Sequence, residues 1–75
     1  SISNNPTTSN FLLNLNTNEK DKASVRVMDA LGRNIDRFEL MPNTMRLYGS
    51  SLTSGVYFIE FRQGSHKGVL RAVKF

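Results

Sequence analysis

The segment from Leu52 to Phe61 constrains the fold most, because it is the longest apolar run in the chain and it starts at a turn signal. Gly55 can take the positive φ that a sharp strand entry needs. Beyond it, Tyr57 and Ile59 fall on one face with Phe61, since side chains alternate along a strand. The residues between them are also apolar at the start of the segment. This pattern predicts a central strand that is buried on both sides at its start.

The entry of this strand has the spacing Leu-x-x-Gly-x-Tyr, which is similar to a tyrosine corner. In such a corner, the hydroxyl of a Tyr at the start of a late strand bonds back to the preceding loop. We expect Leu52 to lie as a plug under the loop and Tyr57 to tether it. The alternative is that both residues belong to the core without any tether.

Other segments of the chain alternate in the same way and are separated by polar turns. They are Phe11–Leu15, Ala23–Asp29, Asn34–Leu40, Thr44–Tyr48 and Val69–Phe75. Turns recur roughly every 8–12 residues and no segment has a helical period, which predicts an all-β sandwich of six or seven short strands. An OB-type barrel is the alternative. The polar residues 1–10 read as a linker and entry turn that packs no core, before a domain of residues 11–75.

The sequence Asp-Ala-Leu-Gly-Arg at positions 29–33 predicts a tight turn that joins two of these strands as a hairpin. Asp29 can accept hydrogen bonds from the turn backbone, and Gly32 can supply the left-handed residue. Leu31 is expected to tuck under the turn.

Two strands carry irregularities. Ile35 is out of phase with Phe38. Either a bulge near Asp36 or a short irregular strand entry would explain this. Near the end of the chain, residues 63–68 read as a turn. In the segment that follows, Val69–Phe75, neither face is fully apolar, so we expect an edge strand.

Composition excludes several classes of protein. A chain of 75 residues makes one domain, and the absence of Cys excludes disulfides and thiolate metal sites. No apolar run approaches the roughly 18 residues of a membrane span. The single His lies in a Gly-flanked turn and the six acidic residues are spread singly, so we expect no metal, no cofactor and no catalytic site. The chain does not begin with Met, and we expect it to be cut from a longer precursor.

Positive charge gathers at the end of the chain. After Phe61 there are four Lys or Arg residues and no acidic residue, although the net charge of the whole chain is only +4. Such an end can bind phosphates, anionic lipid or an acidic protein surface. It can equally be a solvated edge on which Lys and Arg discourage sheet-to-sheet aggregation.

Four segments, in this order and spacing, resemble a known family. They are Asn5-Pro6-Thr7-Thr8, Val25–Arg33, Leu52–Ile59 and the basic terminal strand that ends Arg71-Ala72-Val73-Lys74. Over nearly its whole length the chain resembles the C-terminal sorting domain of the type IX secretion system of the Bacteroidota. The motif residues carried over as structural are Asp29, Gly32, Arg33, Leu52, Gly55 and Tyr57.

The resemblance implies an immunoglobulin-like antiparallel β-sandwich of about seven short strands that acts as a signal and not as an enzyme. Such a domain is covalently fused to an N-terminal cargo protein. It directs the cargo through the periplasm and across the outer membrane, to the cell surface or the medium. The partners implied are the outer-membrane translocon, a shuttle barrel protein, and a sortase-like cysteine peptidase that removes the domain.

Recognition is expected at the last strand, where a carrier can pair with the backbone of an edge strand. Lys67, Arg71 and Lys74 would contribute charge, and Val73 and Phe75 would fill apolar pockets of the carrier. We expect Arg71 and Lys74 to be exposed charges, so that replacing both with Ala should leave folding nearly intact but lower export. The alternative is that this strand only closes the sandwich.

Two other functions fit parts of the pattern. A non-catalytic adhesion or carbohydrate-binding module needs exposed aromatic side chains on a flat face, for which Tyr48 and Phe58 are the candidates. Nucleic-acid binding needs rings for stacking beside phosphate contacts. Most rings here have the phase of core residues, so we expect no nucleic-acid partner.

Overall fold

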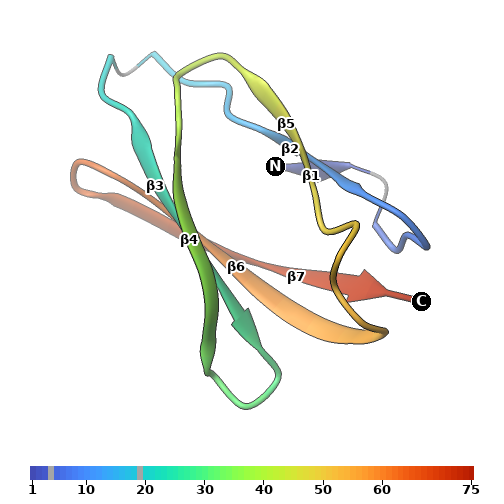
Figure 1. Ribbon diagram of the computed structural model, residues 1–75. Coiled ribbons are helices and arrows are strands. Elements are labelled where there is room, and N and C mark those ends of the chain that lie inside the picture. The colour runs from blue at the N-terminus through green and yellow to red at the C-terminus, as the bar shows by residue number, and fades with distance from the viewer. Residues whose placement is uncertain (4, 19) are drawn as a thin grey trace.

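The computed structural model describes residues 1–3, 5–18 and 20–75, and Figure 1 shows their arrangement. This part of the chain contains seven strands and no helix, and therefore no helix that could cross a membrane. The strands are β1 (Ile2–Ser3), β2 (Phe11–Asn14), β3 (Ala23–Asp29), β4 (Asn34–Leu40), β5 (Met45–Tyr48), β6 (Gly55–Gln63) and β7 (His66–Lys74).

The strands form two antiparallel sheets that face each other (Figure 1). One sheet has three strands in the order β1-β2-β5, and the other has four in the order β4-β3-β6-β7. The predicted all-β fold is therefore confirmed, and the two sheets form a small sandwich. The central position of β6, between β3 and β7, is confirmed, as is the edge position of β7.

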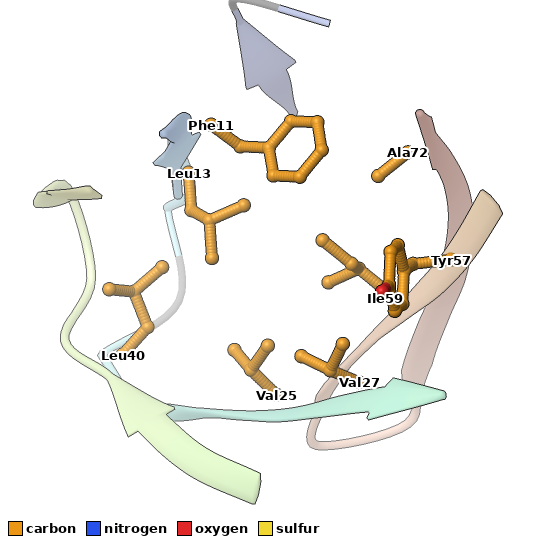
Figure 2. Close-up of a cluster of buried hydrophobic side chains, with 8 residues drawn as sticks. All are labelled: Phe11, Leu13, Val25, Val27, Leu40, Tyr57, Ile59 and Ala72. Atoms are coloured by element: carbon orange, nitrogen blue, oxygen red, sulfur yellow. The ribbon is translucent and has the colours of Figure 1, made fainter. Parts of the chain in front are cut away.

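The core lies between the two sheets and is built by alternation along the strands (Figure 2). In β3, every second side chain is fully buried, and the side chains between them face outward. Burying one such apolar side chain stabilises the fold by roughly 1.5–3 kcal/mol. The core residues are Phe11 and Leu13 of β2, Val25 and Val27 of β3, Leu40 of β4, Tyr57 and Ile59 of β6, and Ala72 of β7.

The first ten residues take a larger part in the fold than the sequence predicted. Ile2 and Ser3 pair with Leu13 and Leu12 of β2, and the Ile2 side chain packs against the core. The prediction that nothing in this segment packs the core is therefore wrong for Ile2. A two-residue strand is too short to show alternation, which is why sequence periodicity missed it.

The irregular phase of β4 comes from a bulge, as one of the two predicted alternatives requires. The register of β3 and β4 shifts between Val27 and Met28, which pair with Asp36 and Asn34, so that Ile35 is the extra residue. Ile35 stays 43% exposed. The bulge therefore keeps the later residues of β4 in phase with the core and leaves Ile35 outside it.

The turn between the last two strands is shorter than predicted. Gln63 pairs with His66, so only Gly64 and Ser65 form the turn, and β6 and β7 each run for nine residues. Gly64 has a φ of 56°, which a two-residue hairpin turn favours. His66 thus begins a strand and does not lie inside a turn, which corrects the predicted turn over residues 63–68.

Strand β5 turns its apolar face outward. Met45 and Leu47 share a face as predicted, but they are 65% and 63% exposed. The other face carries Arg46 and Tyr48, both of which contact Phe38 of β4. The Arg46 guanidinium carbon lies 3.9 Å from the centre of the Phe38 ring, and the Tyr48 ring centre lies 5.2 Å from it. Phe38 and Tyr48 also pack against the core, so a tilted ring pair and a cation over a ring are added to the apolar packing here.

Gly49, in the loop between β5 and β6, is predicted to tolerate no side chain. Its φ is 111°, and a Cβ atom there would lie 3.0 Å from the Phe11 ring. We expect Gly49→Ala to lower the free energy of unfolding by about 1–3 kcal/mol in urea denaturation. Gly68→Ala is the matched control, since nothing lies within 4 Å of its Cβ position. Equal stability of the two variants would contradict this view of the loop.

Candidate functional site

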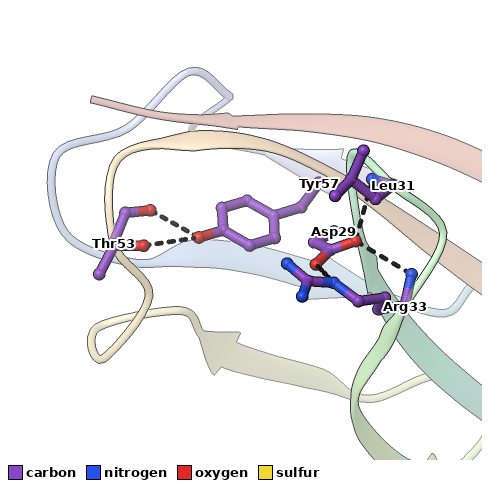
Figure 3. A network of polar contacts seen from close by, with 5 residues as sticks. All are labelled: Asp29, Leu31, Arg33, Thr53 and Tyr57. Carbon is purple, nitrogen blue, oxygen red and sulfur yellow. Dashed lines mark hydrogen bonds and ion pairs between the residues drawn. The ribbon is translucent and has the colours of Figure 1, made fainter.

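The entry of β6 is fixed by the predicted tyrosine tether. The buried Tyr57 hydroxyl donates a hydrogen bond to the Thr53 carbonyl at 2.7 Å and lies 3.2 Å from Thr53 Oγ1 (Figure 3). Leu52 packs against the core as the expected plug, and its N–H bonds the Gly49 carbonyl. The tether therefore holds the whole loop before β6 against the sandwich.

The turn between β3 and β4 is organised around the Asp29 carboxylate. Its Oδ1 accepts hydrogen bonds from the N–H groups of Leu31 at 2.9 Å and Arg33 at 3.0 Å, and its Oδ2 accepts one from Arg33 Nε at 2.7 Å (Figure 3). Gly32 has a φ of 83°, as this turn requires. Leu31, however, is 80% exposed, so the prediction that it tucks under the turn is wrong. The turn therefore closes around a carboxylate and leaves the Leu31 side chain in solvent.

These contacts lower the pKa of Asp29 below its usual value of about 3.8. The main cause is the hydrogen bond from the Arg33 backbone, and the Arg33 side chain and the Leu31 backbone act in the same direction. Desolvation opposes them. Asp29 therefore remains ionised in its role as the centre of the turn.

The turn and the tether lie side by side. Asp29 pairs with Tyr57 across β3 and β6, and a shallow hollow is lined by residues 29–31, Arg33 and residues 54–57. Gly55 pairs in turn with Lys74, which brings the end of β7 to the same end of the sandwich. We call residues 29–33, 52–57 and 71–75 the motif end. All six predicted structural residues lie within it.

Lys74 is part of the interior of the motif end. It is 5% exposed, and its ammonium group donates hydrogen bonds to the carbonyls of Ser9 and Gly49. The expectation that Lys74 is an exposed charge is therefore wrong. It lies on the inward face of β7 with Ala72. Because the side chain is buried, its ammonium group needs protein acceptors in place of water, and the two carbonyls provide them. Its position ties β7 to two loops that are distant in the sequence.

Arg71, Val73 and Phe75 alternate with Lys74. Arg71 pairs with Phe58 and Val73 with Val56, so both project from the outer face of the four-stranded sheet. Arg71 and Phe75 are exposed, and Val73 is half-buried. Among the described residues, no carboxylate forms an ion pair with Arg71. Arg71, Val73 and Phe75 therefore lie at the surface of the motif end.

Lys67 lies apart from the other predicted recognition residues. It lies opposite Arg62, close to the β6–β7 turn. Along β7, Lys67 is about seven residues, or roughly 20 Å, from Lys74. Its ammonium group lies 3.5 Å from Glu60 Oε2, and Arg26 Nη2 lies 3.3 Å from the same oxygen. Lys67 thus neutralises a buried carboxylate and does not join the motif end.

Sequence reasoning missed the part played by residues 5–7. The Asn5 side chain donates to the Arg71 carbonyl at 2.7 Å and accepts from the Val73 N–H at 2.9 Å. Thr7 bonds through its backbone to the Val73 carbonyl at 3.1 Å and to the Phe75 N–H at 2.8 Å. The Asn-Pro pair was visible in the sequence, but nothing local indicated that its partner lies more than sixty residues away.

The described residues hold no metal-binding cluster and no flat face with both candidate rings. In the part of the chain that the structure describes, no three residues of the His, Cys, Asp or Glu type lie together as metal ligands. The two candidate rings for carbohydrate binding lie on different sheets. Tyr48 of β5 donates to Asp36 Oδ2 at 3.0 Å, while Phe58 lies on β6. Burial and this hydrogen bond raise the pKa of Tyr48.

Comparison with protein families identifies the family of the chain. The family described as the secretion system C-terminal sorting domain matches residues 2–74, essentially the whole chain. The chain belongs to this family. The resemblance seen in the four sequence segments is thereby confirmed, and the match supports a sorting signal for type IX secretion. No curated protein matches the chain.

Membership carries coarse consequences for the sorting domain. A secretion tail of this family belongs to an exported protein and interacts with the secretion machinery. The family is not a class of enzymes. The motif residues of this sorting domain hold its strands and loops together at the motif end, and the exposed residues Arg71 and Phe75 lie beside them.

The Asp29 turn predicts a specific pH dependence of stability. Because the folded pKa of Asp29 is lowered, its contribution is present above the unfolded pKa of about 3.8 and is lost as pH falls through the folded value. We expect Asp29→Asn to destabilise the sorting domain at pH 7, and the difference from wild type to shrink towards pH 3. Guanidinium denaturation at several pH values measures this.

The control for this experiment is Asp21→Asn, because Asp21 forms no ion pair with any described residue. Its difference from wild type should be small throughout. A constant effect of Asp29→Asn from pH 7 to pH 3 would show that the carboxylate charge does not hold the turn.

Proposed function

We propose that this sorting domain directs a covalently fused N-terminal cargo through the periplasm and across the outer membrane, to the cell surface or the medium. The observation that carries the proposal is the family match over residues 2–74, which leaves almost no part of the chain for another function. The folded motif end gives a secretion machinery a defined surface to read. The separation of Tyr48 from Phe58 on different sheets removes the support for a carbohydrate-binding face.

The outer-membrane translocon and the shuttle barrel protein are the proposed readers of this surface. Arg71 supplies an exposed charge without an ion-pair partner among the described residues, and Val73 and Phe75 supply apolar surface beside it. Lys74 acts in this proposal by holding the end of β7 in place. Lys67 contributes charge at the other end of the strand, where it also pairs with Glu60.

Removal of the domain by a sortase-like cysteine peptidase is the final step of the proposal. A peptidase needs an accessible and extended segment, and such segments concentrate at the ends of domains. The body of the domain, residues 11–75, is held by sheet pairing along most of its length. Most of residues 1–3 and 5–10 are exposed, so we place the cleaved region at or before them and not within residues 11–75.

A localisation assay tests the function. Residues 1–75 are fused to the C-terminus of a periplasmic fluorescent reporter in a Bacteroidota host, and the position and mass of the reporter are measured. We expect the reporter at the surface or in the medium, about 8.5 kDa lighter than the fusion. Exported reporter at full mass would remove the cleavage step alone. Reporter retained in the periplasm beside a folded domain would overturn the sorting function, and a glycan-binding screen would then test the adhesion alternative.

The role of Arg71 is tested in the same assay. We expect Arg71→Ala to change the free energy of unfolding by less than about 0.5 kcal/mol, because the side chain is exposed, and to lower export several-fold. Arg37→Ala is the control, since Arg37 is an exposed arginine on β4 at the opposite edge of the same sheet. Normal export of Arg71→Ala would exclude this charge from recognition.

Lys74 needs separate treatment in that experiment. Lys74→Met leaves the Ser9 carbonyl without its donor and the Gly49 carbonyl with the Leu52 N–H alone, and it is expected to cost about 1–3 kcal/mol of stability. A loss of export in this variant would therefore report unfolding as well as recognition, so the Arg71 variant decides the question.

A further inference from the structure

Strand β7 has one edge that no strand of the sheet covers. Its partner β6 lies on one side, in a register that pairs Val73 with Val56 and Arg71 with Phe58. The N–H and C=O groups of Val73 bond residues 5 and 7 instead of β6, which shows that they point to the open side. Because backbone groups alternate in direction along a strand, Lys67, Val69 and Arg71 point their groups to the same side.

The half of this edge at the motif end is covered by residues 5–7, which we call the edge cap. The Asn5 amide imitates a peptide group, since it donates to the Arg71 carbonyl and accepts from the Val73 N–H. Thr7 continues the pattern with two backbone hydrogen bonds and forms a parallel bridge with Lys74. The edge cap therefore occupies the backbone groups that a pairing strand would use.

The other half of the edge is open. Within the described part of the chain, no residue bonds the outward N–H and C=O groups of Lys67 or Val69, or the N–H of Arg71. Val69 is 50% exposed and Leu70 is exposed beside it. An unpaired edge of this kind is a template for another strand.

The edge cap is held by polar contacts and by little apolar packing. Asn5 and Pro6 are exposed, Thr7 is half-buried, and none of the three is among the buried residues of the core. Hydrogen bonds at exposed positions exchange with water at small net cost. By contrast, β6 and β7 are joined over nine paired positions. The cap can therefore leave while β7 stays in its sheet.

We propose that the edge cap is displaced when the secretion machinery reads β7, and that an extended strand with an acidic side chain takes its place. This rests on the proposed function, in which β7 is the recognised strand. The incoming strand first pairs with the open stretch Lys67–Arg71 and then replaces residues 5–7 up to Phe75. Its backbone satisfies the outward groups, and its acidic side chain meets the Arg71 guanidinium.

The displacement has a direct consequence for residues 5–7. Once released, this segment has lost its four hydrogen bonds to β7 and is extended and accessible. Binding at β7 thus exposes the region that precedes the body of the domain. Recognition and exposure of this region are coupled because both use the same backbone groups of Arg71, Val73 and Phe75.

Hydrogen exchange tests whether the cap opens as a unit. In the wild-type domain, the amides of Val73 and Phe75 should exchange through a local opening, at denaturant concentrations where those of Val25 and Val27 remain protected. Asn5→Ala removes both side-chain bonds and should speed exchange at Phe75 by roughly fivefold or more, although the Thr7 acceptor is retained. Unchanged exchange at Phe75 would overturn the cap as an independent unit.

The matched control is Asn16→Ala, because Asn16 is exposed and its side chain makes no hydrogen bond within the described residues. In the reporter fusion, followed by pulse-chase, Asn5→Ala should be exported about two- to fivefold faster than wild type or Asn16→Ala. Export at the same rate or more slowly, with the cap shown to be open, would overturn the displacement. Failure of the wild-type fusion to leave the periplasm would instead overturn the proposed function, so the two failures are distinguishable.

Discussion

The pairing of β6 with both β3 and β7 is the constraint on which the rest of the structure depends. Its register sets Asp29 beside Tyr57 on one side and Lys74 beside Gly55 on the other. The three features that define the motif end are therefore placed by one strand. A shift of one residue along β6 would turn every core side chain of that strand to the outer face. The tyrosine tether and the glycine entry fix where β6 begins and so exclude that shift.

The motif end separates structural from surface roles along alternate residues of one strand. Ala72 and Lys74 face the interior, while Arg71 and Val73 face the outer side of the sheet. A basic residue therefore has a structural role on the inner face of β7 and a surface position on its outer face. The Lys74 ammonium group donates hydrogen bonds to two loop carbonyls, whereas the Arg71 guanidinium has no acidic partner among the described residues.

Local sequence pattern was sufficient for the parts of the fold that depend on local physics. Alternation in β3 predicted its three buried side chains, Asp29 and Gly32 predicted their turn, and the spacing before Tyr57 predicted the tether. It failed where the outcome depends on distant segments. Periodicity in β5 showed that Met45 and Leu47 share a face, but only the register with β2 decides that this face is the outer one, because it sets the other two residues of β5 opposite buried side chains of β2. The partners of Asn5 and Lys74 lie at the other end of the chain or in a distant loop, beyond the reach of any local pattern.

The contacts between residues 5–9 and residues 71–75 also bear on the order in which the molecule folds. They join positions separated by 65 to 68 residues, whereas the hairpins β3–β4 and β6–β7 close through short turns. Bringing distant positions together costs more chain entropy than closing a hairpin, so such contacts form late. The four-stranded sheet can thus assemble before the two ends of the sequence meet. A chain in that state already has its four-stranded sheet but lacks the contacts between residues 5–9 and residues 71–75. These contacts therefore form in the last step of folding.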